Sequence, residues 1–382
     1  MKFISKRLDY FDSSTIRAAF EAAATIPNHI DLSIGFPGED TPPHIKEAGI
    51  EAIKDNQTRY TPTNGTQELR QAIAGKLKKE NRIKATTSTV TVVPGSTTGI
   101  LLIYLATLDP DDEVLLPQPY FPPYKDLALM VGAKPVLIDT APTFQLTAEM
   151  IESRLTPKSK LLVINSPNNP TGAVYPKAEL IKIAELARKH HLLVVSDEAY
   201  EYFAYDNVHF SIGSLYPNTL TMNSFSKSYA MTGWRIGYIS GPEPIIEAIN
   251  QLQQYIVFSS SSIGQHASLA ALSRPHDSLN PKYKAKRDLA LSVLRDTFSD
   301  IQGGQGAFYL FLKLPGGISD VGFVNHLAHR GVIVLPGRAF GTYRNYIRVS
   351  YAGEDKNLQQ GLERVCETIK IMTDKKYLVP KR

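Results

Sequence analysis

The chain has 382 residues, of which 43% are hydrophobic and 21% are charged, with a formal net charge of +5. This length predicts about two domains, and the scattered basic excess does not predict a nucleic-acid groove. The sequence has no run of about 18 apolar residues and no apolar stretch of the signal-peptide type near its start, so we expect a cytoplasmic protein without membrane contact. Cys366 is the single cysteine, which rules out a disulfide within the chain and a cysteine zinc cluster.

The first two thirds of the chain alternate short β-branched runs with helical patterns. Such alternation predicts an α/β fold whose large domain has a mostly parallel sheet between helices. The expected strands are 89–93, 113–116, 160–165, 192–196, 219–223 and 235–240, and the expected helices are 100–108 and 178–191.

The pattern changes near the breaker-rich residues 273–277. Beyond them, a charged helix extends to Phe298, and further segments at 307–314, 321–330, 331–336, 346–350 and from about 356 predict a smaller α+β unit. We therefore divide the chain into a large domain, 41–280, and a small C-terminal domain, 281–382. Residues 1–40 are expected to pack with the small domain because they are too short to fold alone.

Polar residues follow the expected strands, at the edge where parallel α/β sheets bind ligands. Gly95, Ser96 and Thr97 come after the first strand and directly before a helix, where free N–H groups favour a phosphate. Asn169 lies in a loop that two prolines and a glycine restrict, so its amide can be held in one orientation. Taken alone, each segment is better explained as an ordinary turn, with a helix N-cap in the first and Asx capping in the second.

A carboxylate ends the strand 192–196. Asp197 is costly to bury unless it is paired, and a protonated pyridine nitrogen is one possible partner. Tyr200, three residues on, is placed to hydrogen-bond a hydroxyl on the same pyridine ring. A helix N-cap or a structural salt bridge is the alternative for Asp197.

Lys227 follows the strand 219–223 and is surrounded by hydroxyls. Ser224, Ser226 and Ser228 flank it, and Arg235 comes eight residues later. A lysine amine forms a Schiff base with an aldehyde, while hydroxyls and a guanidinium hold a phosphate. Pyridoxal 5'-phosphate (PLP) combines both groups. A solvated surface lysine is the alternative, but the other strand ends favour the cofactor jointly.

Motifs for other chemistries are missing from the sequence: there is no P-loop, no G-x-G-x-x-G after an early strand, no H-E-x-x-H and no G-x-S-x-G elbow. We expect no metal.

The chain resembles the aspartate-aminotransferase-like family of PLP-dependent class I/II aminotransferases, which have fold type I. The resemblance covers nearly the whole chain. Its motifs are residues 33–37, 60–65 with 68–70, 119–121, 165–172, 196–200, 224–237 and 346–350.

The resemblance implies roles for particular residues. Lys227 is the Schiff-base lysine, Asp197 pairs with the pyridine nitrogen, and Tyr200 bonds the ring hydroxyl. The remaining cofactor contacts that it implies are Asn169 at the ring hydroxyl, Phe121 on the ring face, Ser96, Thr97, Ser224 and Arg235 at the phosphate, and Tyr60 from the other subunit of a homodimer with shared active sites.

The substrate contacts that the resemblance implies are Arg348 for the α-carboxylate, with Asn169 and the backbone of Gly35. Two positions depart from the family. Phe121 stands where many relatives carry Trp, and Arg338 stands where they often have a small residue. Arg338 is either a surface arginine or a second anion contact, and the latter implies an acidic substrate.

The implied reaction moves an amino group from an L-amino acid to a 2-oxo acid by a ping-pong mechanism, as in amino acid metabolism. Lys227 is expected to carry the proton, with its pKa lowered by Arg235. The alternatives are another PLP reaction, such as elimination at a C–S bond, and a non-catalytic PLP-sensing module. The donor and acceptor are not evident from the sequence.

Overall fold

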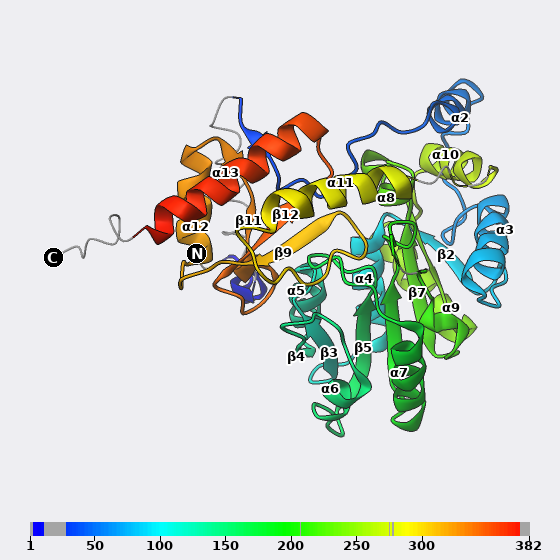
Figure 1. Ribbon diagram of the computed structural model, residues 1–382. Helices are drawn as coiled ribbons and strands as arrows, with labels where there is room; N and C mark the ends of the chain where they lie inside the picture. Colours follow the sequence, from blue (N-terminus) through cyan, green and yellow to red (C-terminus); the bar gives the residue numbers. More distant parts are fainter. Residues whose placement is uncertain (1–2, 11–27, 207, 275, 277–278, 375–382) are drawn as a thin grey trace.

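The computed structural model describes residues 3–10, 28–206, 208–274, 276 and 279–374. A seven-stranded sheet forms the centre of its larger unit (Figure 1). In order across the sheet, the strands are β2 (Val90–Val93), β8 (Gly237–Ser240), β7 (Thr219–Ser224), β6 (Leu193–Asp197), β5 (Ser159–Asn165), β3 (Glu113–Gln118) and β4 (Lys134–Asp139). Only β8 lies antiparallel to its neighbours, so the mostly parallel sheet expected from the sequence is confirmed.

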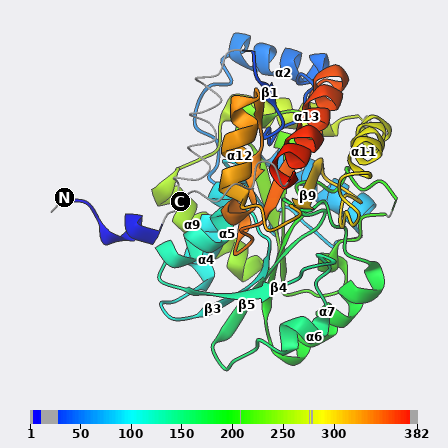
Figure 2. The ribbon, with the colours of Figure 1, turned by 60° about the vertical axis from the view of Figure 1, so that its left-hand side comes forward.

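Helices cover both faces of this sheet (Figure 2). One face carries α4 (Ser96–Thr107), α5 (Pro123–Met130) and α9 (Glu243–Ile256), and the other carries α6 (Ala148–Glu152) and α7 (Lys177–Lys189). Alternation along the strands produces this arrangement: Val163 and Val195 pack toward α4, whereas Ile164 and Val194 pack toward α7. Both faces are therefore apolar, as a buried parallel sheet requires.

Further helices close the β2 edge of the sheet and connect the strands. They are α2 (Pro43–Lys54), α3 (Gln67–Lys76), the π-helix η2 (Leu77–Asn81), the 3-10 helices η3 (Ile212–Ser214) and η4 (Thr232–Trp234), α8 (Phe225–Ser228) and α10 (Ser262–Leu272). A cluster that includes Ile45, Ile73 and Ile236 joins several of them to β2 and β8.

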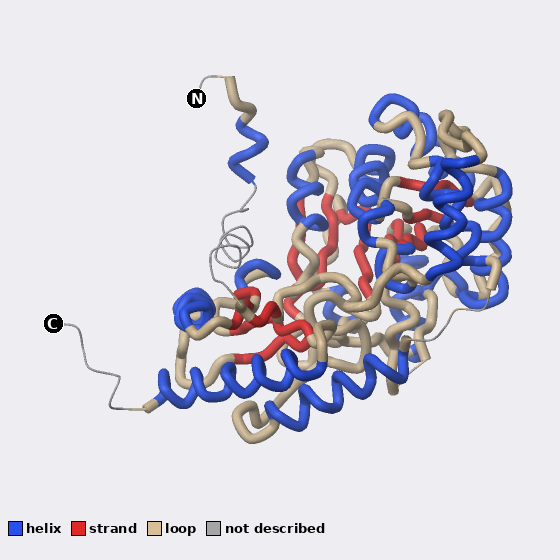
Figure 3. Tube along the Cα trace, turned by 90° about the horizontal axis from the view of Figure 1, so that it is seen from above, coloured by secondary structure: helices blue, strands red, loops and turns tan. Residues whose placement is uncertain are grey.

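A second, smaller unit contains its own strands, as the two groups of strands in Figure 3 show. Its elements are β1 (Ile30–Asp31), α11 (Asn280–Leu294), β9 (Tyr309–Lys313), α12 (Asp320–His329), β10 (Val332–Ile333), β11 (Leu335–Pro336), the 3-10 helix η5 (Gly337–Phe340), β12 (Tyr346–Ser350) and α13 (Asp355–Thr373), and η1 (Lys6–Tyr10) lies near the start of the chain. The sheet β11-β12-β9 is antiparallel, and β1 pairs with β10. Ile30 and Leu32 belong to the apolar cluster of this unit.

The boundaries of several elements differ from the sequence expectation in a way that matters for function. The helix expected at 100–108 already begins at Ser96, and the strands β6 and β7 each run one residue further, to Asp197 and Ser224. The strand expected at 235–240 begins only at Gly237, since Arg235 has a left-handed backbone with φ 57°. The residues with candidate chemistry therefore stand at the very ends of elements. In the described part of the chain, no helix is long and apolar enough to cross a membrane.

Candidate active site

A pocket lies beyond the carboxyl ends of the parallel strands, next to β12 of the smaller unit. The expected site residues that line it are Gly35, Ser96, Thr97, Phe121, Asn169, Asp197, Tyr200, Ser224, Lys227, Arg235 and Arg348. Tyr60 is not among them: it is 83% exposed and its ring lies 4.7 Å from that of Phe258. Residues more than 300 positions apart thus converge on one pocket, and the one expected from another subunit lies outside it.

One end of the pocket has the donors that a phosphate requires. Ser96 and Thr97 open the 12-residue helix α4, whose first N–H groups have no partner within the helix. Gly95 has φ +81°, and a Cβ at this position would come within 2.5 Å of Arg235 Nη2, so only glycine lets the guanidinium approach. Ser224 supplies a hydroxyl from the end of β7. This end fits the phosphate of the cofactor expected from the sequence.

Asp197 lies deep in the pocket and is 4% exposed. Burial raises the pKa of its carboxyl to about 6, although hydrogen bonds from Tyr124 and from the Ala199 backbone oppose the shift. The Tyr124 hydroxyl donates to Oδ2 at 2.6 Å and Ala199 N donates to Oδ1 at 3.1 Å. The carboxylate has hydrogen bonds but no strong counter-charge, so a protonated pyridine nitrogen is the kind of partner it lacks.

Lys227 lies in α8, directly after β7, and its Nζ donates to the Gly35 carbonyl oxygen at 2.5 Å. Burial, and then the charges of Arg348 and Arg235, together lower the pKa of its ammonium to about 8, although Asp197 opposes the shift. The sequence interpretation named Arg235 alone as the cause. Burial and Arg348 contribute more, and neither is visible in the local sequence. A lysine with such a pKa is partly neutral near physiological pH and can act as a nucleophile or base.

Arg348 on β12 forms the opposite wall. It is 5% exposed, its Nη2 donates to Ser33 O at 2.6 Å, and its Nη1 donates to Asn169 Oδ1 at 3.1 Å. The Tyr309 ring lies 4.3 Å and the Phe340 ring 5.0 Å from the guanidinium carbon, while the buried Nε has no hydrogen-bond partner among the described residues. Held between two rings, this guanidinium is oriented for a planar anion such as a carboxylate.

Three further pocket residues were not assigned by sequence reasoning. Tyr124 holds Asp197, Tyr309 lies 3.0 Å from the Tyr200 hydroxyl, and Asn165 donates to the Asp197 carbonyl oxygen at 3.1 Å. Asn165 Oδ1 also accepts from the backbone N–H of Asn169 at 2.9 Å, which fixes the loop that carries this amide. Asn165 was within a quoted motif, but no spacing rule pointed to Tyr124 or Tyr309, since tyrosines at such positions are usually core residues.

Arg338 does not line this pocket. Its Nε and Nη2 donate to Asp320, with the shortest contact 2.6 Å, and Asp320 is fully buried. Arg338 is therefore a half-buried partner of a buried carboxylate and not a freely solvated surface arginine.

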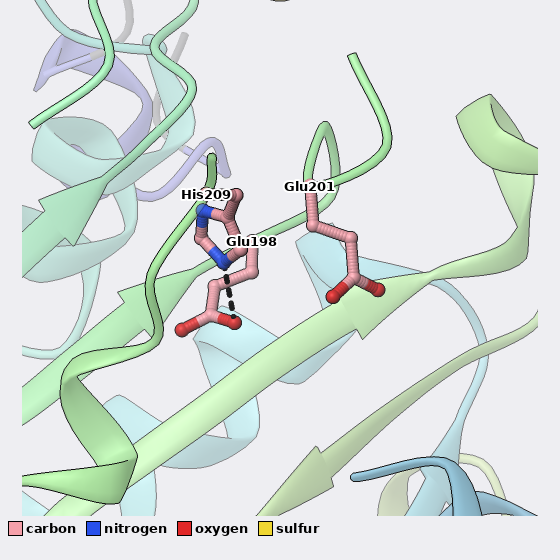
Figure 4. A group of neighbouring side chains, drawn as sticks. All are labelled: Glu198, Glu201 and His209. Atoms are coloured by element: carbon pink, nitrogen blue, oxygen red, sulfur yellow. Dashed lines mark hydrogen bonds and ion pairs between the residues drawn. The ribbon is translucent and has the colours of Figure 1, made fainter. Parts of the chain in front are cut away.

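A second polar cluster lies behind the pocket, on the other face of β6 and β7. Glu198, Glu201 and His209 bring their ligand atoms within 4.8 Å of one another, which is the composition of a metal site (Figure 4). Lys76 Nζ, however, donates to Glu201, and His209 Nε2 lies 3.0 Å from Glu198 Oε2. Each carboxylate already has a partner from the chain, the Lys76 ammonium for Glu201 and the His209 ring for Glu198, so we treat the cluster as an internal network.

Comparison with known proteins gives a consistent result. The family model described as aminotransferase class I and II matches residues 27–365. An aromatic-amino-acid aminotransferase of Thermococcus litoralis is 38% identical, with 96% of this chain and 98% of the relative covered. An aspartate/prephenate aminotransferase of Thermus thermophilus is 36% identical, with 97% and 99% covered. The solved aspartate aminotransferase of Thermus thermophilus with maleate has a TM-score of 0.92 at 36% identity, with 96% and 100% covered.

Proposed function

The chain belongs to the class I and II aminotransferases and is a PLP-dependent transaminase, and we propose that the pocket around Lys227 is its active site. The observation that carries this assignment is the opposed pair of perturbed groups. Burial lowers the pKa of the Lys227 ammonium to about 8 and raises that of the Asp197 carboxyl to about 6. Such pairs in one pocket are typical of acid–base sites.

The chain supplies binding groups for each part of the cofactor. Ser96, Thr97, Ser224 and Arg235 would hold the phosphate, Phe121 would cover one ring face, and Asn169 and Tyr200 would bond the ring hydroxyl. Asp197 would pair with the ring nitrogen, and this pairing removes the burial penalty of its charge. When bound, PLP supplies an aldehyde that takes up the amino group and a ring that accepts electrons from the α-carbon.

The residues of the chain then orient the substrate and move its proton. Arg348 binds the α-carboxylate in a bidentate pair, which places the α-hydrogen near Lys227 Nζ. The bound carboxylate also offsets the charge of Arg348, one of the causes of the low pKa of Lys227, so substrate binding makes the amine a stronger base. The same Nζ serves both halves of a ping-pong exchange between an L-amino acid and a 2-oxo acid.

We further propose that aromatic amino acids are better donors than aspartate. Among the pocket residues that the structure describes, the cations are Lys227, Arg235 and Arg348, and each already has a role. A second carboxylate of the donor would find no further cation among them, whereas the Tyr309 ring lines the pocket beside Arg348. The relatives are named for aspartate, prephenate and aromatic amino acids, so both outcomes exist within the family.

A panel of amino acids tests this proposal. The PLP-loaded enzyme is mixed with phenylalanine, tyrosine, aspartate or glutamate, the change in the visible absorbance of the bound cofactor is followed, and the 2-oxo acid is identified by mass spectrometry. We expect a kcat/KM for the aromatic donors at least about tenfold above that for aspartate. A preference for aspartate of the same size would overturn the donor assignment and leave transamination intact.

We also propose a homodimer, in which Tyr60 reaches the phosphate end of the pocket in the other subunit. Tyr60 and Tyr255 are each 83% exposed, and Ile256 and Phe258 next to them are about half exposed, which is unusual for large apolar side chains. A second copy of the chain over this surface would bury them. Light scattering gives the mass in solution, and Tyr60→Ala is expected to weaken PLP binding in a dimer. A cytoplasmic location is a further proposal, compatible with the single, unpaired Cys366.

A further inference from the structure

The buried network behind the pocket shares its strands with the active site. Along β6, Asp197 lies on the α4 face together with Val195, and the neighbouring Ser196 and Glu198 side chains lie on the other face. Along β7, Ser224 faces the pocket while Asn223 faces the network. Each strand thus ends with one side chain for the ligand and adjacent ones for the network.

Every carboxylate oxygen of the network has a partner. Glu198 Oε1 accepts from Ser196 at 2.8 Å and from Ser211 at 2.6 Å, and its Oε2 accepts from Asn81 at 3.1 Å. Glu201 Oε2 accepts from Asn81 at 2.7 Å, while Glu201 Oε1 accepts from Lys76 and from Asn223. Buried and saturated, these groups have few ways to move without losing a hydrogen bond.

Asn223 is the link from this network to the active site. Its Nδ2 donates to Glu201 Oε1 at 2.6 Å, and its Oδ1 accepts from the backbone N–H of Ser224 at 2.7 Å. Both ends of its amide are therefore used, and Asn223 is 2% exposed. Ser224 stands at the junction where β7 ends and α8 begins, and its Oγ accepts from Ser226 N at 3.1 Å. The position of Ser224 depends on an amide that Glu201 orients.

We propose that Glu201 and Asn223 are positioning residues that hold Ser224 for the phosphate of PLP. This inference rests on the proposed active site. Glu201 is itself fixed by the ammonium of Lys76, which also donates to Asn81 Oδ1 at 2.8 Å. The chain of contacts therefore runs from α3 through Glu201 and Asn223 to the phosphate end of the pocket. Neither Glu201 nor Asn223 lines the pocket, so both would act through Ser224.

The relative affinity for PLP and for pyridoxal distinguishes positioning from a general structural role. Pyridoxal lacks the phosphate, so a displaced Ser224 weakens PLP and not pyridoxal, whereas a loosened fold weakens both. Asn223→Ala removes both hydrogen bonds, and Asn223→Asp replaces the donor with a carboxylate facing that of Glu201. For each we expect the ratio of the two affinities to fall about tenfold, measured on the cofactor-free enzyme by equilibrium titration.

A paired change restores the contact. In the double variant Glu201→Gln with Asn223→Asp, the new amide at 201 can donate to the carboxylate at 223, which still accepts from Ser224 N. The affinity ratio is expected to return to within about threefold of the unmodified enzyme, although Lys76 loses its ion pair with Glu201. Asn218→Asp is the matched control, because Asn218 is exposed just before the start of β7.

The outcomes are distinct. Unchanged affinity ratios in Asn223→Ala and Asn223→Asp, or a double variant no better than Asn223→Asp alone, would overturn the positioning role. If Asn223→Asp does not fold, Asn223→Ala still decides the question, because it adds no buried charge. If the unmodified enzyme itself binds PLP no better than pyridoxal, the proposed phosphate site fails, and that result is separate from the inference about Asn223.

Discussion

The two faces of β6 and β7 carry charged clusters of similar composition in opposite electrostatic states. On the pocket face, Asp197 has no strong counter-charge, the Lys227 ammonium is pushed toward neutrality, and Arg348 keeps a buried nitrogen without a partner. On the other face, Glu198 and Glu201 have hydrogen bonds at every carboxylate oxygen, and Glu201 also pairs with the Lys76 ammonium. Among the residues that the structure describes, the charged groups of the pocket lack a full set of partners, whereas those of the network on the other face have one.

The pKa directions express this difference in consecutive residues. Burial dominates at Asp197 and raises the pKa of its carboxyl. Burial acts to raise the pKa of Glu198 as well, but His209, Ser211 and Ser196 outweigh it, so that the pKa of this carboxyl is lowered. A buried carboxylate that has too few partners within the chain points to a ligand-binding role. A buried carboxylate whose partners the chain supplies points to a structural role. Breaking each cluster should therefore have different consequences.

The largest effect is expected from Lys227→Ala. Lys227 is the one lysine among the described residues that line the pocket, so without its amine turnover should fall by on the order of a thousandfold or more. Steady-state assays with the best donor measure it, and Lys158→Ala, at an exposed position, is the control. Rates near those of the unmodified enzyme would refute the assignment of Lys227.

The sequence predicted the residues of the pocket far better than those of the network around Glu198 and Glu201. Lys227, Asp197 and Asn169 follow strand ends, so their convergence follows from the geometry of a parallel sheet. Glu198 and Glu201 are as close to a strand end, but nothing local shows that Lys76, on a helix more than a hundred residues earlier, pairs with Glu201. Ion pairs between residues far apart in the chain leave no repeating pattern in the sequence from which they could be predicted.

Other gaps have similar causes. Tyr124 and Tyr309 were missed because a buried tyrosine hydroxyl finds its partner only in the folded chain. The mostly parallel sheet was predicted from alternating strands and helices, but the antiparallel placement of β8 was not. The division of the chain at residues 40 and 280 stays a prediction.

The next largest effect, on the stability of the fold, is expected in the network around Glu201. Lys76→Met removes the cation that faces Glu201 and leaves a buried carboxylate without its counter-charge, which should cost about 3–5 kcal/mol in the free energy of unfolding. Urea denaturation measures it, and Lys78→Met, exposed two residues later, is the control. A loss below about 1 kcal/mol would mean that Glu201 does not depend on the charge of Lys76.

Asp197→Asn should have the opposite sign in the cofactor-free protein. Because the folded pKa of Asp197 is raised from 3.8 to about 6, its carboxyl favours folding only while it is protonated, and this contribution is lost as the pH rises through 6. The variant should gain up to about 3 kcal/mol at pH 8, and less as the pH falls below 6.

Glu198→Gln is the matched comparison for that experiment. The folded pKa of Glu198 is lowered, so its ionised form stabilises the fold above its ordinary pKa, and this contribution is lost as the pH falls through the folded value. The variant should therefore be less stable at pH 8. Thermal denaturation from pH 5 to 8 measures both variants, and equal signs for the two neighbours would contradict the contrast between the faces.

The smallest effect on substrate selection is expected from Arg338→Ala. An acidic donor would need the guanidinium to turn into the pocket, but Arg338 is bound through Nε and Nη2 to Asp320, which is fully buried. Releasing it would leave that carboxylate without its cation, a cost that a second substrate carboxylate, arriving from water, does not offset. The ratio of kcat/KM for phenylalanine and aspartate should stay within about twofold while the melting temperature falls. A tenfold shift toward phenylalanine would show instead that Arg338 leaves Asp320 for the substrate, and would make the Asp320 pair part of the specificity site.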